Sequence, residues 1–428
     1  MTVLLLFLLF TMLLVLGVPV AFSMGLSAAG ILILGGSVPL MVLPQRFFSS
    51  LDSFPLMAIP LFILAGNLMN VSGITNAIVR CASSMVGHVR GGLGQVNILT
   101  SVMFSGISGS AAADVAAVGS MLLPAMKKEG YRPEHAVVIT AASAILGPII
   151  PPSLLMVLYG AMTGLSIGTL FLAGILPGLT IAAFLMGWVW WNADRIGGTR
   201  HAWAGFPAIG QSLVRALPAL VLPVLIIGGI QSGIFTATEA GILAVVYALI
   251  FGAVTRQLDL QNALRLTRDA ALSTSAILII LGGAALFAWI IAREGFPAQL
   301  AQALQALTGS RYVALALIIA ALLVLGMFVE TISALILVTP MLAPIAGVYG
   351  LDPIHFAVVV VISVLLGSIT PPVAIILILA CRIGEVPYAA TLRPFLPYFA
   401  IIVAGLLVIA FVPAVTLFLP RELGGYGQ

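Results

Sequence analysis

The chain has 428 residues, of which 62% are hydrophobic and only 7% are charged, and its formal net charge is +4. A soluble globular domain has about a quarter of its residues charged, so this composition excludes that class of protein. No basic run interleaved with aromatic residues points to nucleic acid. Because one crossing of a bilayer takes about 20 helical residues, we expect an all-α polytopic membrane protein, a single integral membrane domain over residues 1–428.

The first hydrophobic stretch, from Thr2 to Leu34, is too long and too apolar for a cleaved signal peptide, so we expect it to remain as one or two spans. Two later stretches, Gly92 to Met126 and Arg311 to Tyr349, exceed the length of one crossing. Each is interrupted midway by Gly, Ser, Thr or an acidic residue. We therefore expect each to form a span followed by a re-entrant hairpin.

Three features of the chain favour structural roles. Glu239 follows Thr236 at a spacing typical of a capped helix start. Charged side chains alternate with leucines between residues 258 and 269, which is typical of a helix on the membrane surface. Cys81 and Cys381 lack the spacing of a metal or redox site, so we expect ordinary small apolar residues.

One segment of the sequence occurs twice. Met121–Pro152 and Met341–Pro372 are related by a constant offset of 220 and share 13 identical residues in 32 positions. Both copies end in Gly-x-x-x-Pro-Pro, beginning at Gly147 and at Gly367. Each of the two long stretches precedes a Gly-Pro-Pro element at a matching distance. Such paired, interrupted hydrophobic segments indicate a transporter with its binding site near the membrane midplane.

The paired prolines should open both helices, because proline lacks an N–H group and clashes with the carbonyl four residues earlier. Carbonyls at residues 147–150 and 367–370 then lose their helical partners. Such carbonyls are tolerated in a membrane where they line a protein cavity, and a sodium ion takes oxygen ligands of this kind. A simple packing kink is the alternative, and the occurrence of two equivalent sites favours the ion site.

Small and polar residues precede each break. Gly and Ser crowd the first hairpin between Ser105 and Ser110, although they also suit close helix packing. The second copy has Glu330, Thr331 and Ser333 at the corresponding place. Asp114 and Glu330 each stand ten residues before a proline. Acidic groups at membrane depth are rare and usually functional, so we interpret both as ion-linked or gating acids, with a structural hydrogen bond as the alternative.

Four stretches carry a resemblance to a known family: DVAAVGSMLLPAMKKEGY, GPIIPPSLLMVLYGAMTGLSIGTLFLAGILPG, GIFTATEAGILAVVYAL and GSITPP. They resemble the large membrane subunit of tripartite ATP-independent periplasmic (TRAP) transporters over most of the chain. The resemblance implies two inverted repeats, each with a re-entrant helical hairpin and a discontinuous helix. It implies an elevator-type symporter of the bacterial inner membrane that imports an organic acid, such as a dicarboxylate or sialic acid.

The resemblance also implies partners and a coupling ion. A periplasmic substrate-binding protein would deliver the acid, and a small four-helix membrane subunit would accompany the chain. That subunit is expected as a separate chain, because no further hydrophobic bundle precedes Met1 or follows Gln428. Sodium is the coupling ion and the only metal expected, with no organic cofactor. A scaffold part is expected over residues 1–90 and 213–269, and a transport part over 91–212 and 270–428.

By position, the resemblance puts hairpin tips near residues 105–110 and 330–333 and discontinuous helices at 147–153 and 367–372. Ala374 and Ala237 depart from residues frequent in the family, glycine and proline respectively. The predicted sodium ligands come from Ser105, Gly106, Ser108, Ser110, Gly147, Ile149, Pro151, Glu330, Thr331, Gly367, Thr370 and Pro372. The predicted substrate-binding residues are Ser108, Gly109, Pro152, Ser153, Ser333 and Pro371.

Two other functions compete with sodium-coupled transport. The segment Gly106–Gly109 matches the Gly-x-Ser-Gly of intramembrane serine proteases, with Ser108 as nucleophile and His135 or His355 as base. Four residues are a weak motif, and a protease does not explain why the Gly-Pro-Pro element occurs twice. A passive channel would need no sodium gradient. We expect a transporter subunit and not an enzyme.

Overall fold

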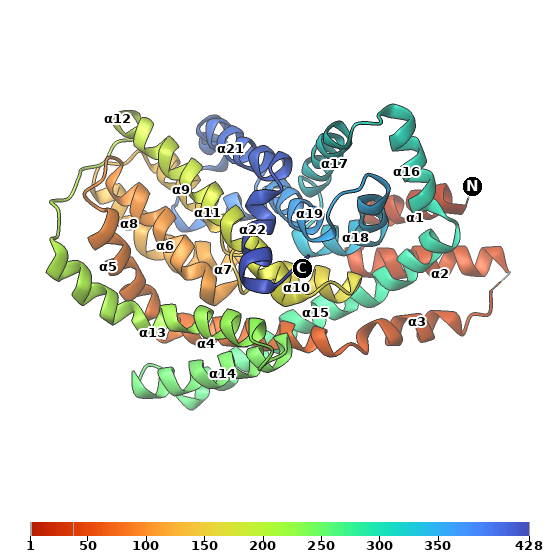
Figure 1. Ribbon diagram of the computed structural model, residues 1–428, viewed down its shortest axis with the longest axis horizontal. Coiled ribbons are helices and arrows are strands. Elements are labelled where there is room, and N and C mark those ends of the chain that lie inside the picture. Colours follow the sequence, from red (N-terminus) through yellow and green to blue (C-terminus); the bar gives the residue numbers. More distant parts are fainter. Residues whose placement is uncertain (1, 37, 428) are drawn as a thin grey trace.

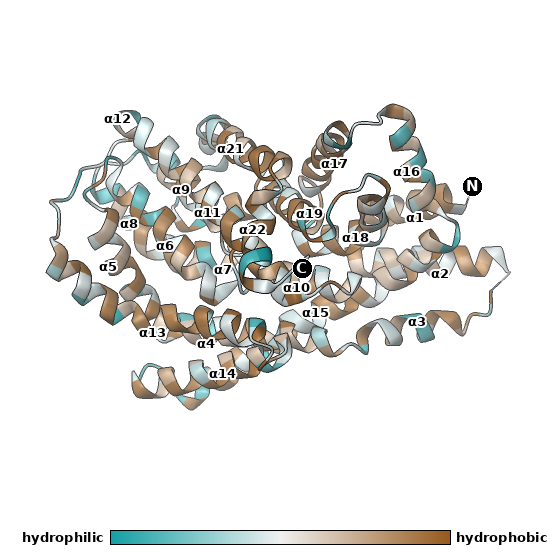
Figure 2. Ribbon diagram, viewed as in Figure 1, coloured by the Kyte–Doolittle hydropathy of each residue, from teal (hydrophilic) through white to brown (hydrophobic). Residues whose placement is uncertain are grey.

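The computed structural model describes residues 2–36 and 38–427, and every regular element in that part of the chain is a helix (Figure 1). Within it, seven helices are long and apolar enough to cross a membrane. An eighth candidate is the pair α16 (Phe296–Leu307) and α17 (Arg311–Gly326), which is bent by 119°. Figure 2 shows apolar residues along most helices and hydrophilic ones mainly at their ends and in the loops, as a lipid environment requires. The prediction of an all-α polytopic protein is confirmed.

The helices follow one another along the chain from the N-terminus to the C-terminus. In order they are α1 (Thr2–Val15), α2 (Val20–Gly35), α3 (Val42–Leu51), a 3-10 turn (Phe54–Met57), α4 (Ala58–Val71), α5 (Ile74–Val86), α6 (Gly92–Ser108), α7 (Ala111–Asp114), a π-helical segment (Val115–Gly119), α8 (Ser120–Lys128), α9 (Pro133–Ala144), α10 (Leu154–Thr163), α11 (Ile167–Trp191), α12 (Ala193–Ile196), α13 (Phe206–Gln231), α14 (Ala237–Val254), α15 (Leu260–Arg293), α16 (Phe296–Leu307), α17 (Arg311–Gly326), α18 (Thr331–Val348), α19 (Pro353–Ser368), α20 (Ile375–Ile383), α21 (Tyr388–Phe411) and α22 (Ala414–Gly424).

Each long apolar stretch folds as one helical hairpin. In the first, α6 leads to a tip at residues 109–110, and α7, the π-helical segment and α8 return. In the second, α17 leads to residues 327–330 and α18 returns. The prediction of a span followed by a separate hairpin was therefore wrong in its division of these stretches. The helices α6 and α17, where independent spans were expected, are the first arms of the two hairpins.

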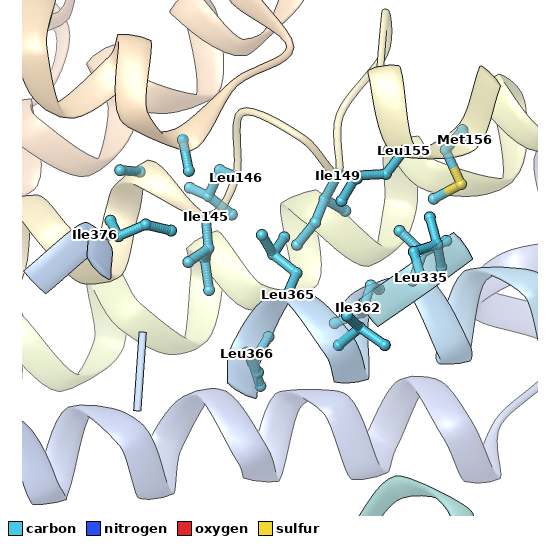
Figure 3. Packing of buried hydrophobic residues seen from close by; sticks show 14 of the residues in the cluster. Ile145, Leu146, Ile149, Leu155, Met156, Leu335, Ile362, Leu365, Leu366 and Ile376 are labelled. Carbon is cyan, nitrogen blue, oxygen red and sulfur yellow. The ribbon is translucent and has the colours of Figure 1, made fainter. Parts of the chain in front are cut away.

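Both Gly-Pro-Pro segments interrupt a helix. The first break separates α9 from α10 over residues 145–153, and the second separates α19 from α20 over residues 369–374. The helix that follows each break packs against the hairpin of the other copy. Thus α10 contacts α18, whereas α20 contacts α7 and the π-helical segment after it. Figure 3 shows the apolar side chains between the copies, with Ile145 and Ile149 on one side and Leu365 on the other.

The helix α15 is a single element of 34 residues. Asp259 caps its first turn by accepting a hydrogen bond from the backbone N–H of Asn262 at 2.6 Å. The amphipathic stretch expected to lie on the membrane surface is the beginning of this helix and not a separate helix. The helix packs on α2, α3 and α4 and also on α18. The predicted scaffold boundary at residue 269 falls inside it.

Tyr131 fixes the base of the first hairpin. Its hydroxyl donates a hydrogen bond to the Gly91 carbonyl at 2.6 Å and accepts one from the Gly94 N–H at 3.1 Å. Burial raises the pKa of this phenol to about 12, so it keeps its proton and continues to donate at neutral pH. The loop after α8 is thereby tied to the first turn of α6.

Candidate functional site

The first hairpin tip turns at Gly109. This residue has φ +57°, a conformation that favours glycine, and its N–H bonds back to the Ser105 carbonyl at 3.4 Å. Ser110 then begins the return arm, because its hydroxyl accepts from the Ala113 N–H at 3.5 Å. The Ser108 hydroxyl lies 3.5 Å from the backbone N and O of Ser110. The Ser108 hydroxyl, the Ser110 hydroxyl and the Ser110 backbone therefore lie close together within the turn.

The first helix break lies directly against this tip. A Cβ atom built on Gly109 would stand 2.6 Å from the Pro152 carbonyl oxygen. One built on Gly147 would stand 3.4 Å from the carbonyl of Ser110. The structure thus brings together the first group of predicted residues. Two members point elsewhere: the Ser105 hydroxyl bonds to the Val102 carbonyl at 2.5 Å, and Gly106 faces the ring of Pro223 on α13.

Backbone oxygens are left free at the first break. Prolines at 151 and 152 supply no N–H groups, and within the described chain no hydrogen bond reaches the carbonyls of Gly147, Ile149 or Ile150. The Pro148 carbonyl accepts from the Ser153 hydroxyl, which also caps α10. Unpaired carbonyls and serine hydroxyls are hard oxygen donors, and Gly147 lies next to Ser110, so the residues present fit an alkali cation. The Ile149 carbonyl faces α11 instead, where a Cβ built on Gly174 would stand 2.5 Å from its oxygen.

The second copy has the same construction with different residues. Gly326 at the end of α17 and Gly367 in α19 allow the two helices to touch. The Glu330 carboxylate caps α18 by accepting from the N–H of Ser333 at 3.1 Å and from its hydroxyl at 3.3 Å. At the break itself, no hydrogen bond among the described residues reaches the carbonyls of Ile369 or Thr370.

Two of the predicted residues at the second break already have hydrogen-bond partners. The Thr370 hydroxyl donates to the Leu366 carbonyl at 2.8 Å, and the Pro372 carbonyl accepts from the Tyr388 hydroxyl at 3.2 Å. Pro151–Pro152 and Pro371–Pro372 are both joined by cis peptide bonds. Ala374, the residue that departs from the family pattern, has φ +45° and so adopts a left-handed conformation without being glycine.

A pocket of about 140 Å³ lies between the two hairpin tips. The first copy contributes Gly109, Ser110 and Pro148, and the second contributes Glu330 and Thr331. Further lining residues that the sequence reasoning missed are Ala111, Ala112, Leu154, Leu155, Ile332, Leu365, Ser368, Ile375 and Ile376. The offset of 220 could have revealed one of them, because Ser368 is the counterpart of Pro148.

Glu330 is the only charged residue among those that line this pocket. Neither lysine nor arginine is present there to balance the charge of a carboxylate ligand. The remaining lining groups are apolar or carry neutral hydroxyls. An organic anion therefore requires a positive charge supplied from outside the side chains of the pocket.

Asp114 lies away from the pocket lining and is completely buried. Neither of its carboxylate oxygens has a hydrogen-bond partner among the described residues. An ionised carboxylate in such a place is strongly destabilised unless a cation or a proton accompanies it.

A second buried polar group joins α6 to α9, where the Asn97 amide donates to Thr140 at 2.7 Å and accepts from Ser143 at 3.0 Å. The sequence reasoning did not single out this pair of contacts.

Glu239 and His355 make hydrogen bonds that stabilise the fold. Glu239 and Thr236 form a complete capping box at the start of α14, as predicted. The His355 ring bonds to the Thr416 hydroxyl at 2.8 Å and to the Ala410 carbonyl at 3.1 Å. No hydrogen bond joins Ser108 to His135 or His355 in the part of the chain described, so the geometry offers no nucleophile and base pair.

Comparison with known proteins decides the family. Residues 7–415 match the family model described as "Tripartite ATP-independent periplasmic transporter, DctM component". The chain belongs to the DctM family. It is 39% identical over 413 residues to the sialic acid TRAP transporter large permease protein SiaM of Vibrio cholerae, covering 96% of this chain and 97% of that protein. It is 36% identical to the 2,3-diketo-L-gulonate TRAP transporter large permease protein YiaN of Escherichia coli, covering 93% and 94%.

A solved structure supports the fold of this DctM protein. The YdaH transporter of Alcanivorax borkumensis, whose crystal structure is described as having an unusual topology, superposes with a TM-score of 0.64 at 13% identity, covering 89% of this chain and 88% of that one. The relatives are transporter permeases and not enzymes. The chain is a multi-pass membrane protein, and the bacterial inner membrane is its expected location.

Proposed function

We propose that this DctM protein is a sodium-coupled symporter subunit that imports an organic acid carrying a carboxylate group. The observation that carries the proposal is the pocket between the hairpin tips, which has an acidic side chain and no cationic residue in its lining. The unpaired backbone oxygens of the two helix breaks, whose neighbours Pro148 and Ser368 line the pocket, add to it. Sodium ions held at the two breaks would supply the positive charge that a carboxylate needs. Ion and anion binding would then depend on each other, which is the requirement for coupling.

Each predicted group of residues has a proposed role. In the first copy, the carbonyls of Gly147 and Ile149 and the hydroxyls of Ser108 and Ser110 are proposed to hold one sodium ion. In the second copy, Glu330, Thr331 and the segment from Gly367 to Pro372 are proposed to hold another. Asp114 is proposed to change its cation or proton occupancy as the first hairpin moves, because its buried oxygens have no hydrogen-bond partner in the part of the chain that the structure describes.

The substrate class follows from the relatives. Sialic acid and 2,3-diketo-L-gulonate, which appear in the names of SiaM and YiaN, are both sugar acids with one carboxylate. A small organic acid of this kind, or a dicarboxylate, is the proposed cargo. A periplasmic substrate-binding protein and a small four-helix membrane subunit are the proposed partners, in keeping with the tripartite family.

Movement of the pocket is proposed to follow an elevator mechanism. The transport part, residues 91–212 and 270–428, would slide against a scaffold of residues 1–90 and 213–269. The reciprocal packing of α10 on the second hairpin and of α20 on the first supports a transport part that moves as one body. Since α15 contacts helices of both parts, the division between them is proposed to lie along its length.

The test is uptake of labelled sialic acid and succinate into proteoliposomes that contain the chain with its small subunit and binding protein. Sodium-coupled transport predicts accumulation above the external concentration that disappears when sodium is replaced by potassium. Equilibration without accumulation would indicate a passive channel. Uphill uptake that is indifferent to sodium would contradict the proposed coupling ion.

A further inference from the structure

A cleft of about 510 Å³ shares no lining residue with the hairpin pocket, although α10 and α18 contribute to both. Its first wall consists of α3 and α15, and the second includes Ala161 and Met162 of α10 and Pro340 of α18. The ring of Phe47 packs on Gly282 and joins α3 to α15 beside the cleft. This volume suits a small organic molecule.

One face of α3 gives the cleft its polarity. Arg46, Ser49 and Ser50 line it from α3, and their spacing of three and four residues places them along one side of the helix. Ser53, in the extended segment after α3, also lines the cleft. The facing wall of α15 offers mainly alanines, including Ala284 and Ala288. One wall of the cleft thus carries hydroxyls and an arginine, and the other carries small apolar side chains. A ligand that is polar on one side fits between them.

Two arginines lie near the ring of Trp289, which lines this cleft. Arg46 lines the cleft itself, whereas Arg293 lies beside it, next to the lining residue Ala292. The guanidinium carbon of Arg46 is 5.7 Å from the ring centre of Trp289, and that of Arg293 is 5.5 Å from it. The two positive charges therefore lie within about 11 Å of each other, on a ring that attracts both. In the described chain neither arginine forms an ion pair, although Asp52 and Glu294 are near in sequence. This arrangement is a ready site for an anion.

We infer that the cleft is a second binding site for the carboxylate group of an organic acid, held by Arg46 and Arg293 with the α3 hydroxyls. The inference rests on the proposed function, because the hairpin pocket has no cationic side chain of its own. An acid bound first at the arginines would be held at a site lined in part by α10 and α18, the helices that also contribute to the pocket. The cleft would thus raise the occupancy of the pocket at low substrate concentration.

The test uses Trp289 as the reporter, in the full chain assembled with its small subunit in phosphatidylcholine nanodiscs. The other four tryptophans are replaced by phenylalanine, and sialic acid and succinate are titrated to millimolar concentration. We expect a saturable change in fluorescence that is lost in Arg46→Gln and Arg293→Gln, is partly retained in Arg46→Lys, and persists in Arg265→Gln, an exposed arginine of α15. No saturable change with either acid would overturn the inference.

Uptake measurements separate this inference from the proposed function. Loss of one charge-assisted contact is expected to raise the KM for uptake about tenfold, with little change in maximal rate. If wild-type uptake proves independent of sodium, the proposed function fails while the fluorescence titration still decides the cleft. If sodium-dependent uptake is normal and neither arginine variant alters KM, the cleft inference fails alone. A fluorescence change caused by phosphatidylglycerol but not by the acids would identify a lipid headgroup site and overturn it as well.

Discussion

Gly326 on α17 and Gly367 on α19 face each other with no space for a side chain. A Cβ built on Gly367 would stand 2.5 Å from the Gly326 Cα, and one built on Gly326 would stand 2.7 Å from the Gly367 Cα. The atoms in the way belong to the backbone, so rotation of a side chain cannot relieve the clash. The second hairpin therefore meets the second discontinuous helix by direct backbone contact.

Gly367→Ala is expected to force these helices apart and to destabilise the protein by about 1–3 kcal/mol, the usual cost of overpacking. Thermal unfolding in detergent measures the effect. Gly347→Ala is the matched control, because Gly347 lies in α18 with nothing within 4 Å of its built Cβ. That control should be neutral or stabilising by up to about 1 kcal/mol, since alanine favours a helix. Equal stability of the two variants would contradict the contact.

Substitutions of Glu330 separate helix capping from ion binding. Glu330→Gln keeps an oxygen that can accept from the Ser333 N–H, so stability should change little, whereas the loss of charge should weaken sodium activation of uptake. Glu330→Ala removes the cap as well and should cost about 1 kcal/mol more. Unfolding curves and sodium titrations of uptake, measured on both variants, give the answer. Normal sodium activation in Glu330→Gln would leave Glu330 as a cap only.

Thr370 and Thr180 make the same local hydrogen bond but lie in different places. Each hydroxyl donates to the carbonyl four residues earlier, at 2.8 Å. Alanine substitution at either position should therefore have a similar, small effect on stability, within about 1 kcal/mol. Only Thr370→Ala is expected to lower the apparent affinity for sodium, measured from uptake at varied sodium concentration. A matching loss in Thr180→Ala would show that the effect is not specific to the break.

Ala374→Gly should relieve backbone strain at the second break. The left-handed conformation costs a non-glycine residue about 1–2 kcal/mol, and glycine loses about 0.5–1 kcal/mol of this gain through its greater freedom when unfolded. A net stabilisation of up to about 1 kcal/mol is therefore expected in thermal unfolding. Ala380→Gly, inside α20, should instead destabilise by about 1 kcal/mol. Destabilisation of similar size at both positions would argue against strain at Ala374.

Asp114→Asn tests the buried acid while preserving its shape. Because neither carboxylate oxygen accepts a hydrogen bond from the described residues, the neutral amide should leave thermal stability unchanged or improve it. The sodium dependence and the pH dependence of uptake should nevertheless be altered, since the group can no longer change its occupancy by a cation or a proton. Uptake of Asp114→Asn with wild-type dependence on both would assign Asp114 to structure alone.

The sequence predicted the two helix breaks because their cause is local. A proline cannot donate a backbone hydrogen bond wherever it stands in a helix, so Gly-x-x-x-Pro-Pro identifies the interruption without tertiary information. The hairpin boundaries were harder to predict. Gly109 gives a local signal for the first turn, but the second tip, Met327 to Glu330, contains no glycine or proline. Its turn depends on how α17 packs against α19.

The pocket lining and the arginine cleft could not be predicted from local patterns. Ser368, the last residue of α19, lines the pocket because α19 packs on α10, and only the repeat offset hints at its place. Arg46 and Arg293 are separated by almost 250 residues, and only the packing of α3 on α15 brings them to Trp289. The alternating leucines and charges of residues 258–269 could not show that this stretch continues into a long helix, because the same pattern suits the exposed end of one.

The length of α15 bears on how the molecule sits in lipid. Its 34 residues correspond to about 51 Å at the usual rise of 1.5 Å per residue, whereas the hydrocarbon core of a bilayer is about 30 Å thick. An upright helix of this length is longer than the hydrocarbon core, so α15 has to tilt or project into water. Thicker membranes favour a steeper helix and thinner ones a flatter helix. Bilayer thickness thereby becomes a physical variable that acts on the α3–α15 wall of the arginine cleft.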